Sequence, residues 1–327
     1  MKALFIGGTG NISTAVSRLA LERGLELWVL NRARRDALAG ARQLLGDVAD
    51  DGSVRRAVEG HEWDVVVNFI AFAPRDVERD VASFHGRTRQ YVFISSASVY
   101  EKPPRRPVVT ESTPLLNPYW EYSQQKIACE DVLYRAHRER GFPCVVVRPS
   151  LTYATVLPIA LGGFHDFTLV ERMRRGEPIV VHGDGTSLWT LTHADDFARG
   201  FLGLLGNPDT IGHAFHITSD EWLTWNQIYT EIARAAGAEP RVVHIPTDFL
   251  VRTAPELRGT LLGDKMHSLL FDNAKIKSFV PDYRARIAFR DGIRGTIAWF
   301  DERPERRRPL PENDQLLDRL IAAYAQR

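Results

Sequence analysis

Short apolar runs alternate along the first half of the chain with segments whose apolar positions recur at helical spacing. The runs occupy residues 3–6, 25–30, 65–70, 91–95 and 144–148. Runs this short and this continuously apolar are typical of strands that are covered on both faces. Strands that alternate with helices predict parallel pairing and right-handed crossovers. We therefore expect an α/β fold with a doubly wound parallel sheet.

The pattern loosens after Pro149, which indicates a second region. A strand over 177–182 and a helix over 195–205 are expected to return to the sheet domain, which would comprise residues 1–150 and a return segment of about 177–210. Residues 151–176 and 211–327 are expected to form a smaller substrate-binding lobe with C-terminal helices. The spacing of Thr224 and Gln227 predicts a capping box before a helix that runs towards Ala236. Further helices are predicted over 291–300 and 316–324.

Composition narrows the classes of protein. With 327 residues and 44% hydrophobic content, the chain can bury one large core or two modest ones. Its formal charge of +1 provides no overall field for nucleic acid or an anionic membrane. Two cysteines build no disulfide framework, and no apolar run approaches the ~18 residues that span a bilayer. We expect a cytoplasmic protein with neither nucleic acid nor membrane as a partner.

A glycine turn lies between the first predicted strand and the helix that follows. At this point of a dinucleotide-binding fold, the helix N-terminus and a backbone without side chains approach the pyrophosphate. Ser13 stands where a third glycine is usual, and it is small enough to preserve the packing of helix on strand. We predict cofactor contacts from Gly7, Gly8, Thr9, Gly10, Asn11 and Ile12.

The end of the second predicted strand bears on the choice of cofactor. Asn31 occupies the place where an acidic residue would bind the ribose hydroxyls of NAD. Arg32, Arg34 and Arg35 follow, and guanidinium groups there suit the 2′-phosphate of NADP. The alternative interpretation is a solvated basic start to a helix. The cofactor is therefore expected to be NAD or NADP, with a slight preference for NADP.

Three further residues have the chemistry of hydride transfer at a carbinol carbon. Tyr122 and Lys126 lie one helical turn apart, so the ammonium is expected to lower the pKa of the phenol and to hold the nicotinamide ribose. A tyrosine of lowered pKa serves as base in oxidation and as acid in reduction. Ser96, after a predicted strand, would hydrogen-bond the substrate oxygen. Taken alone, this pair is more often an ordinary aromatic and a solvated charge, but the preceding glycine turn and serine strand favour catalysis.

Together these motifs resemble those of an extended short-chain dehydrogenase/reductase of the NAD-dependent epimerase/dehydratase family, over nearly the whole chain. The resemblance implies a Rossmann domain with Ser96, Tyr122 and Lys126 as its catalytic residues. It further implies a homodimer through helices near 76–85 and 119–140, although the first is short and a monomer stays open. The remaining implied cofactor contacts are Asp47 and Val48 at the adenine, Ile70 and Ala71 near the nicotinamide ribose, and Tyr122 together with Lys126.

The departures from that family lie on the substrate side. Leu151, Trp189 and Leu261 stand where members acting on nucleotide-diphosphate sugars carry an asparagine and two arginines. A buried diphosphate without such partners would be costly. Ser98 belongs to a pair that replaces the Asp-Glu of the dehydratases, so dehydration ranks below epimerisation and oxidoreduction. We predict Ser98, Leu151, Trp189 and Leu261 as substrate contacts, with Trp189 in either a stacking or a core role.

The leading hypothesis is an NAD(P)-dependent epimerase or oxidoreductase. It would act on a secondary hydroxyl of a sugar, nucleotide sugar or nucleoside-like substrate through a transient keto intermediate. One alternative is an NADPH-dependent ketoreductase that exchanges its cofactor. A second, from another class, is a catalytically silent nucleotide-sensing or RNA-binding relative. No grouping of histidines and carboxylates has convincing metal spacing, so no metal is expected.

Overall fold

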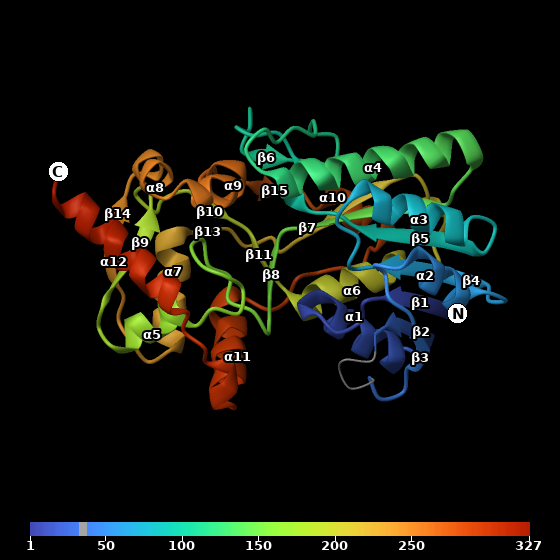
Figure 1. Ribbon diagram of the computed structural model, residues 1–327, viewed down its shortest axis with the longest axis horizontal. Coiled ribbons are helices and arrows are strands. Elements are labelled where there is room, and N and C mark those ends of the chain that lie inside the picture. The colour runs from blue at the N-terminus through green and yellow to red at the C-terminus, as the bar shows by residue number, and fades with distance from the viewer. Residues whose placement is uncertain (33–37) are drawn as a thin grey trace.

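The computed structural model of the protein describes residues 1–32 and 38–327. A seven-stranded parallel sheet forms its larger region, shown in blue to yellow on the right of Figure 1. The predicted doubly wound α/β fold is confirmed. In spatial order the strands are β12 (Ala214–Ile217), β7 (Cys144–Pro149), β5 (Thr88–Ile94), β4 (Trp63–Asn68), β1 (Lys2–Ile6), β2 (Glu26–Asn31) and β3 (Arg42–Leu45).

Successive side chains of each strand enter separate cores on the two faces of the sheet. From β1, Phe5 packs with Val16 of α1 (Asn11–Glu22) and Phe197 of α6 (Ala194–Leu204). Leu4 instead packs with Leu133 of α4 (Glu121–Arg140) in the core of the opposite face. That core also receives α2 (Asp51–Val58) and α3 (Pro74–Phe84). Because both faces are covered, the central strands β1 and β4 are mainly apolar, as their sequence predicts.

The register of the sheet aligns the carboxyl ends of its strands. Ile6 pairs with Leu30 on one side and with Asn68 on the other. Asn68 pairs in turn with Phe93 of β5. The residues that follow these strands therefore meet at one edge, which is where open α/β sheets bind ligands.

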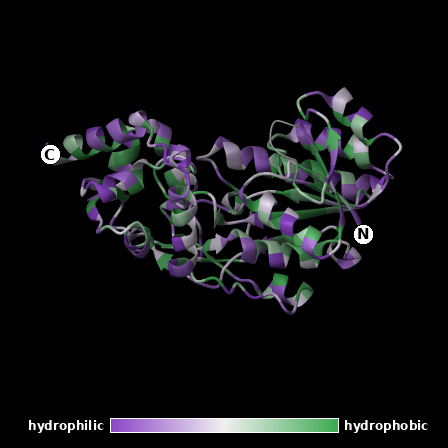
Figure 2. Cartoon of the chain, turned by 90° about the horizontal axis from the view of Figure 1, so that it is seen from below, coloured by the Kyte–Doolittle hydropathy of each residue, from purple (hydrophilic) through white to green (hydrophobic). Residues whose placement is uncertain are grey.

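The smaller region contains several short paired strands and a layer of helices. Its helices include α5 (Thr168–Arg174), α7 (Trp225–Ala235), α8 (Thr247–Thr253), α11 (Phe289–Asp301) and α12 (Pro311–Ala325). Its strand pairs are β9 (Pro178–His182) with β14 (Arg241–Ile245), β8 (Leu151–Tyr153) with β11 (Leu191–His193), and β10 (Leu188–Trp189) with β13 (Leu223–Thr224). Figure 2 shows hydrophobic residues gathered inside both regions.

Short elements connect the two regions. They include β6 (Val108–Val109), which pairs with β15 (Leu270–Phe271), together with α9 (Arg258–Thr260) and α10 (Ala274–Phe279). α10 packs against α6 and β12 of the large sheet. No helix in the described ranges is both long enough and apolar enough to cross a membrane.

Four details of the strands and helices confirm or correct the predictions from sequence. The capping box at Thr224 is present, and α7 begins after it as expected. The predicted strand over 177–182 exists as β9, but it pairs with β14 and not with the large sheet. The chain returns to that sheet through α6 and β12, a short strand that the pattern did not reveal. The edge strand β3, whose residues are mostly exposed, was also missed.

Candidate active site

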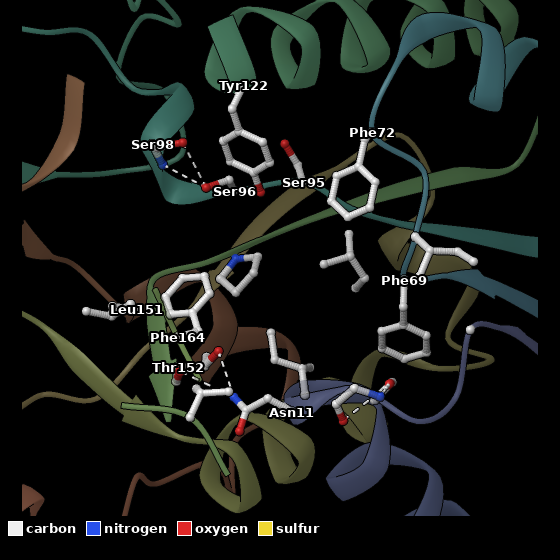
Figure 3. Close-up of a pocket in the computed structure, with 18 of the residues that line it drawn as sticks. Asn11, Phe69, Phe72, Ser95, Ser96, Ser98, Tyr122, Leu151, Thr152 and Phe164 are labelled. Carbon is white, nitrogen blue, oxygen red and sulfur yellow. Dashed lines mark hydrogen bonds between the residues drawn. The ribbon is translucent and has the colours of Figure 1, made fainter. Parts of the chain in front are cut away.

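A cavity of about 870 Å³ opens at the carboxyl edge of the sheet, between the two regions. Its lining joins the turn after β1, the ends of β2, β4, β5 and β7, and segments of the smaller region. Figure 3 shows side chains from these separate parts of the chain directed towards a common space. Most of the predicted site residues lie on this lining, in two groups that we call the nucleotide half and the substrate half of the cavity.

The glycine turn forms one wall of the nucleotide half, through Gly7, Thr9, Gly10, Asn11 and Ile12. Gly7 has φ +77°, and a Cβ built there would lie 2.6 Å from Cγ2 of Ile70. Only glycine satisfies both conditions. The Gly10 amide donates to the Ser13 hydroxyl at 2.8 Å as α1 begins. The bare backbone at the start of α1 therefore fits the pyrophosphate of a dinucleotide.

Two predicted cofactor residues contribute from behind this wall. Gly8 does not line the cavity, and a Cβ there would approach Val29 to 3.0 Å, so its role is to pack the turn against β2. Ile70 lines the cavity, whereas Ala71 contributes its carbonyl group to Lys126. Asn11 connects the turn to the smaller region, because its side-chain oxygen accepts a hydrogen bond from the backbone N–H of Thr155 at 3.0 Å.

The end of the nucleotide half that was predicted to bind adenosine holds Asn31, Arg32, Asp47 and Val48. A guanidinium nitrogen of Arg32 lies 4.0 Å from a carboxylate oxygen of Asp47, and both side chains are about half exposed. The Asn31 side chain accepts a hydrogen bond from Gln43 at 2.7 Å. Arg34 and Arg35 lie outside the described residues. The preference for NADP therefore stays a prediction.

Lys126 lies buried beneath the junction of the two halves. Its ammonium donates to the carbonyl oxygens of Ala71 at 2.7 Å and Ile94 at 2.8 Å. It also lies 4.6 Å from the centre of the Phe72 ring. Burial lowers the pKa of Lys126 to about 8. The amine is thus fixed at the ends of β4 and β5, where the nicotinamide ribose is expected.

Ser96 and Tyr122 meet at the same junction. The Tyr122 side chain descends from α4 towards Ser96, which follows β5 (Figure 3). The Ser96 hydroxyl lies 2.9 Å from the Ser98 hydroxyl. Burial raises the pKa of Tyr122 to about 12; the hydrogen bond with Ser96 lowers that pKa, and the charge of Asp264 raises it further.

This raised pKa corrects one sequence-based expectation. Lys126 was expected to lower the pKa of Tyr122, but its ammonium is engaged by two carbonyl groups and lies 5.7 Å from the centre of the phenol ring. The desolvation of the phenol dominates instead. In this structure Tyr122 is a neutral phenol at neutral pH, which is the form that acts as an acid.

A buried ion pair lies behind β5, the strand that ends just before Ser95 and Ser96. Glu130 of α4 accepts two hydrogen bonds from Arg148, at 2.6 and 3.0 Å. It also accepts one from the Ser95 hydroxyl at 2.6 Å. Neither Glu130 nor Arg148 lines the cavity. Their contacts fix α4 relative to β5 and β7, and hence Tyr122 relative to Ser96.

The substrate half collects its walls from distant segments. Of the predicted substrate contacts, Ser98, Leu151 and Trp189 line the cavity. Leu261 does not, because it is fully buried in a core with Leu250. Five other lining residues were not predicted as site residues, because only the fold brings them together: Trp120, Phe164, Asp264, Lys265 and Phe271.

The glycine turn, the strand edge and the serine, tyrosine and lysine beside it define the class of protein, an NAD(P)-type oxidoreductase with a Rossmann domain. Comparison with known families agrees with this class. The model of the NAD dependent epimerase/dehydratase family matches residues 3–218, and the chain belongs to this family. It is thus an enzyme of the extended short-chain dehydrogenase/reductase type.

Individual relatives show the breadth of the family. The chain is 24% identical to 2'-dehydrokanamycin reductase of Streptomyces kanamyceticus, over 88% of this chain and 81% of that protein. It is 26% identical to the chloroplast stem-loop binding protein of 41 kDa b of Arabidopsis thaliana, over 76% and 67% of the two chains. The UDP-glucuronic acid 4-epimerase of Bacillus cereus, solved in complex with NAD, superimposes with a TM-score of 0.72 and 16% identity over 92% and 97%.

Proposed function

We propose that the protein catalyses NAD(P)-dependent epimerisation or oxidoreduction at a secondary hydroxyl of a sugar-like substrate, with Tyr122 as the acid/base. The observation that carries this proposal is the meeting of Ser96 and Tyr122 in the cavity whose other half is walled by the glycine turn. A substrate oxygen at this junction would reach a phenol and a hydroxyl while its carbon faces the nucleotide half. That is the geometry that hydride transfer requires.

Each polar residue at the junction has a distinct role in this proposal. In reduction the neutral phenol of Tyr122 donates its proton to the substrate oxygen, and in oxidation the phenolate left by that transfer takes the proton of the substrate hydroxyl. Ser96 donates a hydrogen bond to the oxygen on which negative charge develops. Lys126 would use its remaining N–H for a ribose hydroxyl; in this structure two carbonyl groups hold its ammonium beneath the cavity lining. The nicotinamide would supply the hydride acceptor at the edge of the sheet.

The fate of the cofactor separates an epimerase from a reductase. One relative is named as a reductase and one structural neighbour as an epimerase, so the family contains both outcomes. An epimerase returns the hydride and needs no net turnover of cofactor. Denaturing the purified protein and identifying the released nucleotide by mass spectrometry tests the point. Tightly held oxidised NAD or NADP supports epimerisation, whereas an empty protein that consumes NADPH with its substrate supports reduction.

Binding of RNA is the second candidate function, because one relative is named as a stem-loop binding protein. The formal charge of +1 provides little attraction for phosphates. An RNA-binding role would also leave Ser96, Tyr122 and Lys126 without a purpose. Titration of the protein with a labelled RNA stem-loop at two salt concentrations tests this role, and tight, salt-dependent binding that survives Tyr122→Phe would favour it.

The family resemblance also bears on how many copies of the chain associate. We propose that two copies associate through α3 and α4, as the family resemblance implies, with a monomer as the alternative. The two helices already pack together within one chain. Light scattering at two protein concentrations separates the two states. A mass of one chain at both concentrations would remove the dimer.

A further inference from the structure

A short turn of the smaller region places two charged side chains in the wall of the substrate half. Asp264 and Lys265 end the π-helical turn Leu261–Lys265, whose wide loop is closed by a hydrogen bond from the Met266 amide to the Leu261 carbonyl at 3.0 Å. Single π turns occur frequently at functional sites, because they redirect the side chains that follow. Both residues line the cavity that holds Tyr122.

This turn is fixed from both regions of the molecule. The Asn117 side-chain amide donates to the Ser98 carbonyl at 2.8 Å and to the Gly263 carbonyl at 2.6 Å. It thereby joins the turn to the serine loop after β5. From the other side, the Lys265 carbonyl accepts hydrogen bonds from His182 at 3.0 Å and from the Trp225 indole at 3.1 Å. Asp264 consequently has a defined position relative to the catalytic serine and tyrosine.

The polar atoms of this wall are incompletely paired. Lys265 donates to Oδ2 of Asp264 at 2.7 Å, and the two side chains are only 7% and 12% exposed. No described residue donates a hydrogen bond to the other carboxylate oxygen. Trp189, which is 3% exposed, has an indole N–H that is buried without a partner in the described structure. The second carboxylate oxygen of Asp264 is therefore free to accept a hydrogen bond from a ligand in the cavity.

The surroundings of these atoms suit a sugar ring. The wall carries the aromatic rings of Trp120, Trp189 and Phe271 beside the carboxylate. Aromatic rings cover the apolar face of a sugar, while a carboxylate receives its hydroxyl or amino groups. Among the described lining residues the one arginine is Arg32, which lies in the nucleotide half. The charge of Lys265 is already matched by Asp264, so no described cation of this wall is left to bind a diphosphate.

We propose that Asp264, held by Lys265, binds the substrate by accepting a hydrogen bond from a hydroxyl or amino group of a sugar that carries no diphosphate. This inference rests on the proposed function and adds the substrate class to it. The carboxylate provides affinity for the polyol or amino sugar, and its neutral pair with Lys265 offers no free cation to the phosphates of a nucleotide-diphosphate sugar.

Binding of sugars to the NAD-loaded protein tests this subsite without any need for turnover. The probes are glucose, glucosamine and UDP-glucose, and the readout is the fluorescence of the tryptophans in the cavity wall. We expect saturable binding of glucose or glucosamine, weakened by about tenfold or more in Asp264→Asn, because a hydrogen bond to a charged group contributes about 1.5–3 kcal/mol. Asp264→Glu should recover part of the affinity. Asp220→Asn, which removes an Asp–Lys pair outside the cavity, is the matched control and should bind as wild type.

Three results would overturn the subsite. They are binding of UDP-glucose about tenfold tighter than glucose, equal binding by Asp264→Asn and wild type, and no saturation by either free sugar. The proposed function fails separately. Turnover that survives Tyr122→Phe would remove the catalytic assignment while the binding results stand. Turnover of UDP-glucose that Tyr122→Phe abolishes would keep the catalysis and remove the subsite.

Discussion

In the nucleotide half of the cavity the lining residues follow parallel strands directly, whereas the substrate half draws on segments far apart in the sequence. Gly7, Asn31 and Ile70 each come within two residues of a strand end. Trp120, Phe164 and Asp264 belong to separate loops and turns. The nucleotide half is therefore fixed by the sheet that every member of such a fold must build. The substrate half is free to vary because it carries no part of that sheet.

The largest effect is expected at Tyr122, where the two halves meet. Tyr122→Phe removes the proton donor, so turnover should fall by roughly 10²–10⁴-fold, the usual contribution of a general acid or base. Cofactor affinity should change far less than turnover, because the glycine turn stays intact. Steady-state rates and nucleotide titration measure the two properties. Tyr119→Phe, three residues earlier and outside the cavity lining, is the control that should keep full activity.

The buried ion pair of Glu130 and Arg148 behind β5 should contribute strongly to the stability of the fold. Glu130→Gln leaves Arg148 as a buried charge without its partner, so the free energy of unfolding should fall by about 3–5 kcal/mol. The exposed pair of Glu26 and Arg42 offers a matched control. Glu26→Gln should change stability by about 1 kcal/mol or less. Urea unfolding of both variants makes the measurement, and equal losses would contradict the distinction between a buried and an exposed pair.

The glycine turn provides a sharper test of the nucleotide half. Gly7→Ala combines a left-handed backbone with a methyl group 2.6 Å from Ile70, whereas Gly60→Ala has a similar φ of +73° and no atom within 4 Å. The φ conflict should cost both variants about 1–2 kcal/mol. Gly7→Ala should lose about 1–3 kcal/mol more through overpacking, together with nucleotide affinity. Nucleotide titration and urea unfolding separate the two effects. Equal nucleotide affinity in both variants would contradict the assignment of the glycine turn to the pyrophosphate.

The smallest effect concerns the pH dependence of stability. Burial lowers the pKa of Lys126 from 10.5 to about 8, so the folded protein binds fewer protons than the unfolded chain between these values. The desolvation penalty is fully present below pH 8 and disappears as pH rises towards 10.5. The stability of wild type relative to Lys126→Met should therefore increase over that interval. Urea unfolding at the two ends of the interval checks the trend, and a constant difference would contradict it.

The same comparison explains how much the sequence could predict. The strands, the glycine turn and the spacing of Tyr122 and Lys126 are local patterns; the large sheet that they predict is confirmed, and the structure brings these residues together at its carboxyl edge. The short strand β12 and the exposed strand β3 carry too little hydrophobic pattern to be recognised. Asp264 enters the cavity only because Asn117 and Lys265 hold its turn across the molecule. Leu261 was assigned to the substrate by its place in a family pattern, but it is directed into the core.

The most direct test of the account is to measure which nucleotide the purified protein holds or binds. Protein stripped of nucleotide is titrated with NAD and with NADP, after the nucleotide released on denaturation has been identified by mass spectrometry. We expect one dinucleotide per chain, bound by wild type and lost in Gly7→Ala, since the glycine turn admits the pyrophosphate. A wild-type protein that carries no dinucleotide and binds neither cofactor would contradict the enzyme that we propose.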